Sequence, residues 1–478
     1  MNSENLKTNW GQFIPLVTVF FFWGFVAASN DILIPVFKKA FDLTQGQSQL
    51  VSIAFYVAYT VGSLILLAIS YLMKGDLINK IGYKNSLALG LIISAFGTLL
   101  FYPAANLHSF PLMLSGLFTV ALGFSLQQTV ANPLAIALGP ITTGSQRLTL
   151  AGGINNLGTT IGPLIVSFAI FGAVSAGNTT MSIESVKLPY LVLGAAFLIV
   201  AVLLKMSSLP DKPQGVVDTE EVSDSSFFAA LKYPQLVLGM IAIFLYVGVE
   251  VSTASNLPAY METKLGFKIG DIAPYISLYW ASLMIGRWTG AVEAFTEDVS
   301  LQKILRFVAP YLAFGVFLGV NKFMEHDLTP FYVYALIIIV LIVADIASKG
   351  NPARMLLIFS TLGIIALLTG MFTTGNISVY AFTSVGLFCS TLWPCIFTLA
   401  VSGLGKHTSQ GSSFLIMMIM GGGIVSWLQG TVADSIGIQS SYIVGVLCFA
   451  YLAFYGWKVS GILKSQGINF DKKVSGGH

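Results

Sequence analysis

Long hydrophobic runs, roughly 18–28 residues each, recur along almost the whole chain, and about 20 apolar residues are enough for a helix to cross a bilayer. The runs are too long for the strands of a membrane barrel and lack their alternation. The pattern therefore predicts an all-α membrane protein. We expect fourteen spans, at 12–36, 49–72, 86–104, 110–138, 148–174, 188–208, 235–258, 272–294, 304–321, 330–348, 355–373, 377–402, 411–431 and 440–461.

Composition and charge agree with this pattern. Only 9% of the residues are charged, whereas a soluble domain is typically about 25% charged. With the N-terminus in the cytoplasm, seventeen of the 24 Lys and Arg residues fall in inside segments and six outside, as the positive-inside rule predicts. We therefore expect both termini in the cytoplasm. The net charge of +3 reflects this topology and does not indicate a nucleic-acid partner.

The chain divides into two related halves. The longest polar interruption, residues 210–226, follows the sixth predicted span. Residues 129–158 and 391–423 share a mid-span proline, a loop with Gly, Ser, Thr and Gln, and a Gly-rich helix. Two related six-helix units are typical of a transporter built from parallel repeats. We expect an N-terminal bundle at 1–208, a cytoplasmic linker at 209–234, a C-terminal bundle at 235–478 and two extra helices at about 304–348.

The stretch FVAASNDILIP, residues 25–35, places Asp31 in a span as the only ionisable side chain among residues 12–36. A carboxylate deep in a bilayer-spanning helix costs about 2.5–3.5 kcal/mol. Small residues lie one and two turns back on the same face, at Ala27, Ala28 and Gly24. Such residues let another helix approach closely, so we expect Asp31 to face the bundle interior. An aspartate at the membrane interface is the alternative.

Amide and aromatic side chains inside the spans give the candidate ligand-binding residues. Amides and hydroxyls supply the donors and acceptors that a polyhydroxylated ligand needs, although hydrogen bonds between helices would use the same groups. Tryptophan rings can stack against a sugar ring, and Glu250 can form a structural ion pair with Arg287. The candidate substrate-binding residues are Asn30, Gln127, Gln128, Asn132, Asn155, Asn156, Glu250, Asn256, Trp280 and Trp393.

Enzyme chemistry has little support in the sequence. The four histidines are scattered over predicted loops and the C-terminus, and none pairs with a carboxylate at metal-ligand spacing. Neither GxSxG, HExxH nor a phosphate-binding glycine loop is present. We therefore expect no enzyme activity and no cofactor.

Several segments carry a resemblance to a known family, among them NDILIP, VANPLAIALGP, SQRLTLAGGINNLGTTIGP, MIGRWTG and WPCIFTLAVSGLGKHTSQGS. They resemble the fucose–galactose–glucose symporter family of the major facilitator superfamily, closest to its glucose/galactose branch. The resemblance implies a monomer in the bacterial inner membrane that imports a monosaccharide by alternating access, driven by a cation gradient. It also implies that Asp31 couples the cation and that Asn30 contacts sugar.

Two departures from the family pattern bear on the substrate. The fucose–proton branch has a glutamate where this chain has Gln128, and many members have glutamine where this chain has Gly152. A proton would need only Asp31, whereas Na⁺ would need further oxygens, for which Asn155 and Thr159 are candidates. The sequence leaves both ions open. It also leaves open an exporter working by antiport and a membrane sugar sensor that transports nothing.

Overall fold

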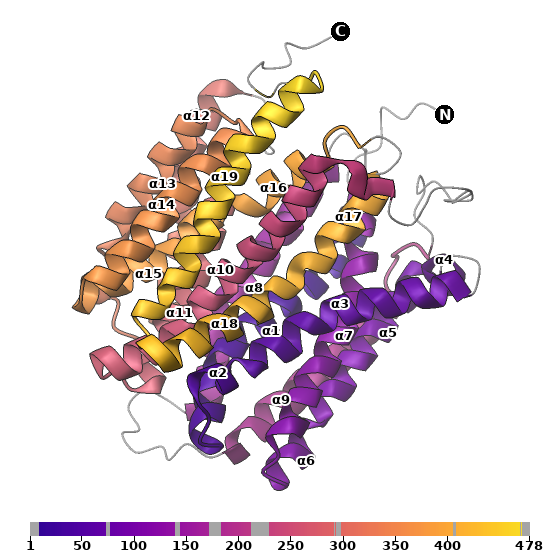
Figure 1. Cartoon of the computed structure of the whole chain (residues 1–478). Coiled ribbons are helices and arrows are strands. Elements are labelled where there is room, and N and C mark those ends of the chain that lie inside the picture. Colours follow the sequence, from indigo (N-terminus) through magenta and orange to yellow (C-terminus); the bar gives the residue numbers. More distant parts are fainter. Residues whose placement is uncertain are drawn as a thin grey trace.

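The computed structural model describes residues 9–72, 77–138, 144–171, 183–211, 229–290, 292, 298–404, 408–468 and 470. The regular elements of these residues are α-helices and short 3-10 helices (Figure 1). The predicted all-α architecture is therefore confirmed. The first half of the chain contains α1 (Trp10–Ala40), α2 (Gln45–Ser48), α3 (Leu50–Leu72), α4 (Leu77–Ile81), α5 (Tyr83–Leu99), α6 (Phe101–Asn106), α7 (Phe110–Ala137), α8 (Gly144–Phe171), η3 (Ile183–Val186) and α9 (Lys187–Met206).

The second half is organised around the long helix α10. Its elements are η4 (Ala229–Lys232), α10 (Pro234–Leu265), α11 (Ile269–Gly290), α12 (Val299–Phe323), η6 (Thr329–Phe331), α13 (Tyr334–Ser348), α14 (Pro352–Phe372), α15 (Gly375–Cys389), α16 (Leu392–Val401), α17 (Thr408–Met417), η8 (Met418–Met420), α18 (Gly421–Ile436), η9 (Ser440–Tyr442) and α19 (Ile443–Ser465). Most of the predicted linker lies outside the described residues, so the domain boundaries stay predictions.

Among the described residues, thirteen helical segments are long and apolar enough to cross a membrane. The prediction of fourteen spans is therefore not confirmed. The difference is the span predicted at 272–294, which corresponds to α11, a helix of 22 residues. Protein contacts α11 on several sides, since it packs on α8, α12 and α15. A helix enclosed in this way is not required to be apolar all round, and α11 carries Asp271, Ser277 and Arg287.

Close helix contacts depend on glycine. The first helix packs along α8. A Cβ added to Gly24 would lie 2.0 Å from the Asn155 carbonyl oxygen, and one added to Gly158 would lie 2.1 Å from that of Phe21. Both distances are far below van der Waals contact, so only glycine permits this approach. The α1–α8 contact thereby fixes the face of α1 that carries Asp31.

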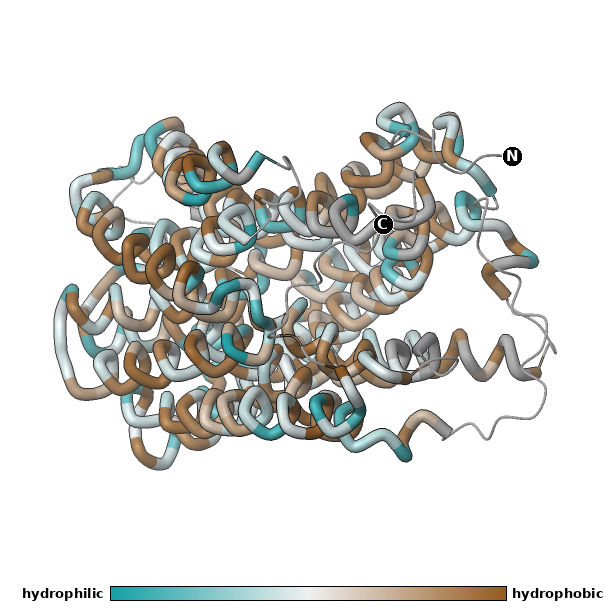
Figure 2. The backbone as a smooth tube through the Cα atoms, turned by 90° about the horizontal axis from the view of Figure 1, so that it is seen from above, coloured by the Kyte–Doolittle hydropathy of each residue, from teal (hydrophilic) through white to brown (hydrophobic). Residues whose placement is uncertain are grey.

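The main contacts between the halves are those of α8 with α11, of α1 with α10 and α11, and of α2 and α3 with α18 and η8. Of the additional helices, α12 packs mainly on α11 and also contacts α8, and α13 packs on α14 and α15 (Figure 1). Figure 2 shows hydrophobic residues along most of the helices, with hydrophilic residues scattered between them.

Candidate functional site

The buried carboxylate of Asp31 links the two halves of the molecule. Its side chain is 3% exposed, and its Oδ2 accepts a hydrogen bond from the indole Nε1 of Trp280 at 2.8 Å. Asp31 belongs to α1 and Trp280 to α11, 249 residues further along the chain. A hydrogen bond to an ionised acceptor is shorter and stronger than a neutral one. The protonation state of Asp31 therefore bears directly on a contact between the halves.

The first half contributes several other polar side chains, of which Tyr56 lies within electrostatic range of Asp31. The amide of Asn30 is buried, and neither its nitrogen nor its oxygen has a hydrogen-bond partner within the described part of the chain. The Gln128 amide donates to the Tyr59 hydroxyl at 3.3 Å. One turn before Tyr59 on α3, the Tyr56 hydroxyl lies within electrostatic range of Asp31 and Glu250. These groups can donate to and accept from a hydroxylated ligand.

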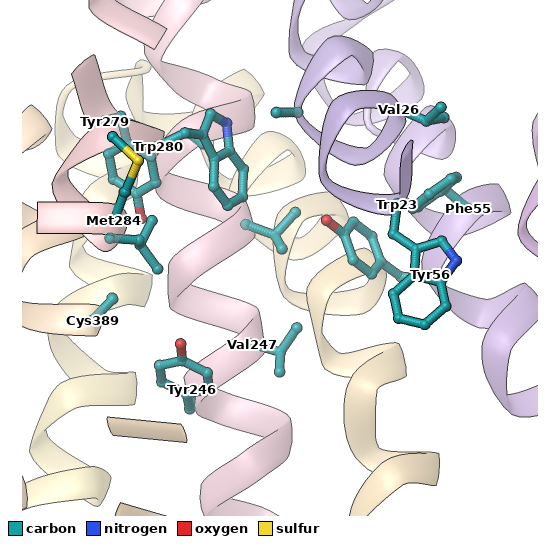
Figure 3. Close-up of a cluster of buried hydrophobic side chains, with 14 of the residues drawn as sticks. Trp23, Val26, Phe55, Tyr56, Tyr246, Val247, Tyr279, Trp280, Met284 and Cys389 are labelled. Carbon is teal, nitrogen blue, oxygen red and sulfur yellow. The ribbon is translucent and has the colours of Figure 1, made fainter. Parts of the chain in front are cut away.

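The sequence interpretation did not include Tyr56 and Tyr59 among the site residues. A signal was present, because two tyrosines spaced three residues apart share one face of an otherwise apolar helix. That signal is weak, since tyrosines also pack as ordinary hydrophobic residues. Figure 3 shows the Tyr56 hydroxyl directed from the first half toward the side of Trp280, and the Tyr246 hydroxyl directed upward, on the side of Tyr279 and Met284. Tyr56 belongs to α3 in the first half, and Tyr246 belongs to α10 in the second half.

The second half contributes Glu250 and Arg287. The Arg287 guanidinium donates to Asn156 Oδ1 at 3.2 Å, whereas the Asn156 amide nitrogen is buried without a partner among the described residues. Glu250 interacts electrostatically with Arg287 and with the Tyr246 hydroxyl. Within the described residues, no Glu250–Arg287 ion pair closer than 4.0 Å occurs. The structure thus brings the predicted pair into one neighbourhood, with Asn156 as the direct partner of Arg287.

The two candidate stacking tryptophans have different surroundings. Trp280 is buried and bonded to Asp31, as described above. Trp393 is half-buried, with its ring stacked near Phe397 at a centroid distance of 6.4 Å and tilted against Tyr246 at 6.2 Å. Trp393 is therefore described by its aromatic contacts, whereas Trp280 also donates a hydrogen bond to Asp31.

Three other predicted residues are engaged elsewhere in this conformation. Gln127 accepts from Trp23 at 3.0 Å and donates to Ser94 at 3.1 Å, both within the first half. The Asn155 amide donates to the Phe20 carbonyl at 2.9 Å. Asn256 accepts from Gln45 at 3.0 Å, away from Asp31 and close to α2. Asn132 is half-buried on α7.

The oxygens considered for a Na⁺ site are not gathered around Asp31. The Asn155 carbonyl and the Thr159 methyl group pack on Gly24. Asp31 lies seven residues further along α1, which is about 10 Å at the helical rise of about 1.5 Å per residue. The structure therefore does not bring Asp31, Asn155 and Thr159 together.

A second group of polar contacts closes the end of the interface near α2. The Asp434 carboxylate of α18 accepts from the backbone nitrogens of Gln45 and Gly46, at 2.8 Å each. Lys39, near the end of α1, forms an ion pair with Glu262 of α10. The sequence interpretation missed these contacts, because each residue alone reads as an ordinary polar residue near a helix end.

The fold and the site together define a class of protein. Many helices long enough to span a membrane form two halves, and a buried carboxylate joins them beside unpaired amides and tyrosine hydroxyls. Ionisable groups buried inside a membrane bundle mark ion or substrate pathways. These features define a secondary transporter.

Comparison with known proteins agrees with this class. Residues 16–320 match the Major Facilitator Superfamily, and the chain belongs to this family, within its group of fucose, glucose and galactose transporters. It is 34% identical to the glucose/galactose transporter of Brucella abortus over 444 residues, 92% of each chain. It is 29% identical to the L-fucose-proton symporter of Escherichia coli over 467 residues, 93% of this chain and 92% of that one.

A solved structure gives the same answer for the fold. The crystal structure of FucP, a Major Facilitator Superfamily transporter in the outward conformation, superposes with a TM-score of 0.61 at 28% identity. The match covers 94% of this chain and 98% of that one. The protein is therefore a sugar transporter of the glucose/galactose/fucose symporter group and not an enzyme, as the sequence predicted.

Proposed function

We propose that the protein imports a hexose of the glucose or galactose type together with a proton, by alternating access of its two halves. The observation that carries this proposal is the hydrogen bond from Trp280 to Asp31. It makes a titratable carboxylate part of the contact between the halves. We also propose that the protein works as a monomer in the bacterial inner membrane, with both termini in the cytoplasm.

Coupling follows from how protonation changes this contact. An ionised Asp31 is a strong acceptor for the Trp280 N–H, whereas a protonated carboxyl group is a weaker one. Protonation therefore weakens a contact that holds α1 against α11. A sugar that binds beside Asp31 and favours its neutral form makes sugar binding and proton binding support each other. Opening toward the cytoplasm then releases both.

A proton is favoured over Na⁺ by the surroundings of Asp31. A proton needs the carboxylate alone, whereas a Na⁺ ion needs several oxygens around it. Asn155 and Thr159 pack on Gly24, about two helical turns from Asp31. The Escherichia coli relative is named a proton symporter, which agrees with this choice.

For the sugar, we propose contacts from both halves. Asn30 and Gln128 of the first half, with Asn156, offer amides, and Glu250 of the second half offers a carboxylate acceptor. We add Tyr56 as a hydroxyl donor facing the same region. The name of the Brucella abortus relative supports glucose or galactose as the substrate. Gln127, Asn132, Asn155, Asn256 and Trp393 stay predictions of sugar contacts.

Reconstituted liposomes test this proposal. Uptake of labelled glucose, galactose, fucose and N-acetylglucosamine is measured with an inward proton gradient, an inward Na⁺ gradient or no gradient. We expect accumulation of glucose or galactose under the proton gradient only. In Asp31→Asn, accumulation should be lost while sugar exchange without a gradient persists, since the amide keeps an acceptor for Trp280 but cannot carry the proton. Accumulation in Asp31→Asn equal to wild type would refute the coupling role.

The exporter by antiport and the membrane sensor are distinguished in the same liposomes. An exporter working by antiport would let protons into the vesicle and move sugar out of it in exchange. A sensor would bind labelled sugar and show neither uptake nor exchange. Either result would replace the importer as the proposed function.

A further inference from the structure

Beyond the central residues, the interface contains a buried polar seam, which we define as Gln49, Ser252 and Gln429. Gln429 on α18 is fully buried, and neither atom of its amide has a hydrogen-bond partner within the described part of the chain. The hydroxyl of Ser252 on α10 is likewise buried and unpartnered among these residues. Unsatisfied buried polar groups are costly and rare in native proteins, so their presence needs an explanation.

The register of α10 and α18 places these two residues at the same level along the helix contact. A Cβ at Gly421 would lie 2.0 Å from the Phe244 carbonyl oxygen, and a Cβ at Gly248 would lie 2.5 Å from Val425. The contacts advance by four residues on both helices, which therefore run in the same direction. One further turn on each helix brings Ser252 and Gln429 to the same level.

The other half of the molecule supplies Gln49. A Cβ at Gly430, the residue after Gln429, would lie 2.8 Å from Gln49 Cγ. The Gln49 amide donates to the Ser255 carbonyl at 3.3 Å, and its oxygen accepts from Ser52 at 3.4 Å. A single long hydrogen bond, to Ser255, therefore joins Gln49 to α10. This bond crosses the interface between the halves, which must separate when the end near α2 opens.

The seam lies between the central site and the closed end. On its inner side, a Cβ at Gly422 would lie 3.1 Å from the Tyr56 ring and 3.1 Å from Val247, both next to the central residues. On its outer side, Gln45 bonds to Asn256 and to the Asp434 carboxylate. A solute passing from the closed end to Asp31 along this interface meets the seam first.

We propose that Gln49, Ser252 and Gln429 form a second, outer subsite for the hydroxyl groups of a sugar, occupied when the end near α2 is open. Two amides and a hydroxyl supply donors and acceptors from both halves. Apolar side chains would pack this interface without unsatisfied groups, whereas a polyhydroxylated solute satisfies the amide of Gln429. This subsite rests on the proposed function. It determines which hydroxyl groups of a hexose the protein recognises as the sugar enters.

The subsite is tested by combining a substitution of Gln429 with the removal of single hydroxyl groups from the sugar, as in a double-mutant cycle. Initial rates of proton-driven uptake into liposomes are measured for glucose, galactose and their 2-, 3-, 4- and 6-deoxy analogues, with wild type and Gln429→Leu. A contact from Gln429 predicts that removing one particular hydroxyl lowers the wild-type kcat/KM about three- to tenfold. The same removal should change kcat/KM less than about twofold in Gln429→Leu, since the partner is already gone.

The matched control is Ser426→Ala, which removes a buried hydroxyl one turn away that bonds to the Gly422 carbonyl of its own helix. It should leave the cost of every deoxygenation unchanged. If Gln429→Leu does not fold, Ser252→Ala is measured in the same way.

A uniform loss for all sugars in Gln429→Leu would assign Gln429 to gating alone and overturn the subsite. Unchanged kinetics would overturn it too. Absence of uptake of every hexose by wild type would instead refute the proposed function, and the subsite with it.

Discussion

At the scale of single residues, the account depends on one carboxylate and its partner. Asp31 could be singled out in the sequence because it is the only ionisable side chain among residues 12–36. The sequence also predicted Trp280 as a site residue, for stacking on a sugar ring, but not as the partner of Asp31, which lies 249 residues earlier in the chain. The structure adds that the indole N–H, and not only the ring, is used.

Replacing Trp280 tests the role of that N–H. Trp280→Phe keeps an aromatic ring but removes the donor, which leaves the buried Asp31 carboxylate without its bond. A hydrogen bond to a charged group contributes about 1.5–3 kcal/mol, so proton-driven uptake should fall about 10- to 150-fold. Trp457→Phe is the control, because Trp457 is exposed on α19 and its ring contacts Phe454, and its uptake should fall less than about threefold. Equal losses in the two variants would contradict the role of the N–H.

The two neighbouring amides Gln127 and Gln128 show that residue type alone does not predict which side chain faces the site. Gln127 and Gln128 are neighbours of the same type, yet Gln127 bonds to Trp23 and Ser94 while Gln128 reaches Tyr59. Neighbouring helix positions point about 100° apart, so one amide packs between helices and the next faces the site. The face each takes depends on helix rotation, which residue types alone do not determine.

At the scale of helices, the position of Asp31 depends on the close packing of α1 on α8. Gly158→Ala would place a methyl carbon 2.1 Å from the Phe21 carbonyl oxygen, so the helices must separate. Overpacking typically costs about 1–3 kcal/mol and here involves backbone, so a lower melting temperature in detergent and reduced uptake are expected. Gly315→Ala on α12 is the control, since no atom lies within 4 Å of its added Cβ. A Gly158→Ala protein as stable and as active as Gly315→Ala would argue against this packing role.

The predicted spans were confirmed where the apolar runs were long, but the span predicted at α11 was not confirmed. Long apolar runs gave most spans, because a helix facing lipid must be apolar on its outer side. α11 contacts α8, α12 and α15, and its polar residues serve contacts inside the protein. Its hydropathy is therefore a poor guide to its place in the fold. The extra helices α12 and α13 were predicted, but nothing in their sequence indicated that α12 would cover α11.

At the scale of the whole molecule, the two halves are held closed at the end near α2. Repeats in the sequence predicted two halves, but contacts such as Gln45 with Asp434, 389 residues apart, had no sequence signal. The Asp434 carboxylate accepts two backbone N–H groups at 2.8 Å, and the Lys39–Glu262 ion pair lies at the same end. Asp434 and Lys39 are exposed to solvent, and Glu262 is partly exposed. An exposed ion pair contributes about 0–1 kcal/mol and a hydrogen bond about 0.5–1.5 kcal/mol, so we expect the two bonds of Asp434 to contribute more to the closure.

Asp434→Ala should therefore shift the molecule toward opening at this end. Because Asp434 is exposed, we expect the loss of its two hydrogen bonds to cost about 1–1.5 kcal/mol, which changes the ratio of closed to open molecules about 5- to 13-fold. Spin labels at Leu107→Cys and Ile436→Cys, both exposed near this end, report the separation of the halves. We expect a longer-distance population to appear in Asp434→Ala. Asp327→Ala, which removes an exposed carboxylate bonded to Thr329 within one loop, should leave the distances unchanged. Identical distance distributions in Asp434→Ala and wild type would contradict the closure.

Sugar-induced proton flux tests whether the sugar moves together with a proton carried by Asp31. Unbuffered liposomes holding the protein receive glucose or galactose with no imposed gradient, and external pH is recorded together with labelled sugar uptake. The account predicts that external pH rises with sugar entry at about one proton per sugar, and that Asp31→Asn exchanges sugar without any pH change. Sugar uptake that requires Na⁺ and moves no protons, or a pH change that persists in Asp31→Asn, would contradict it.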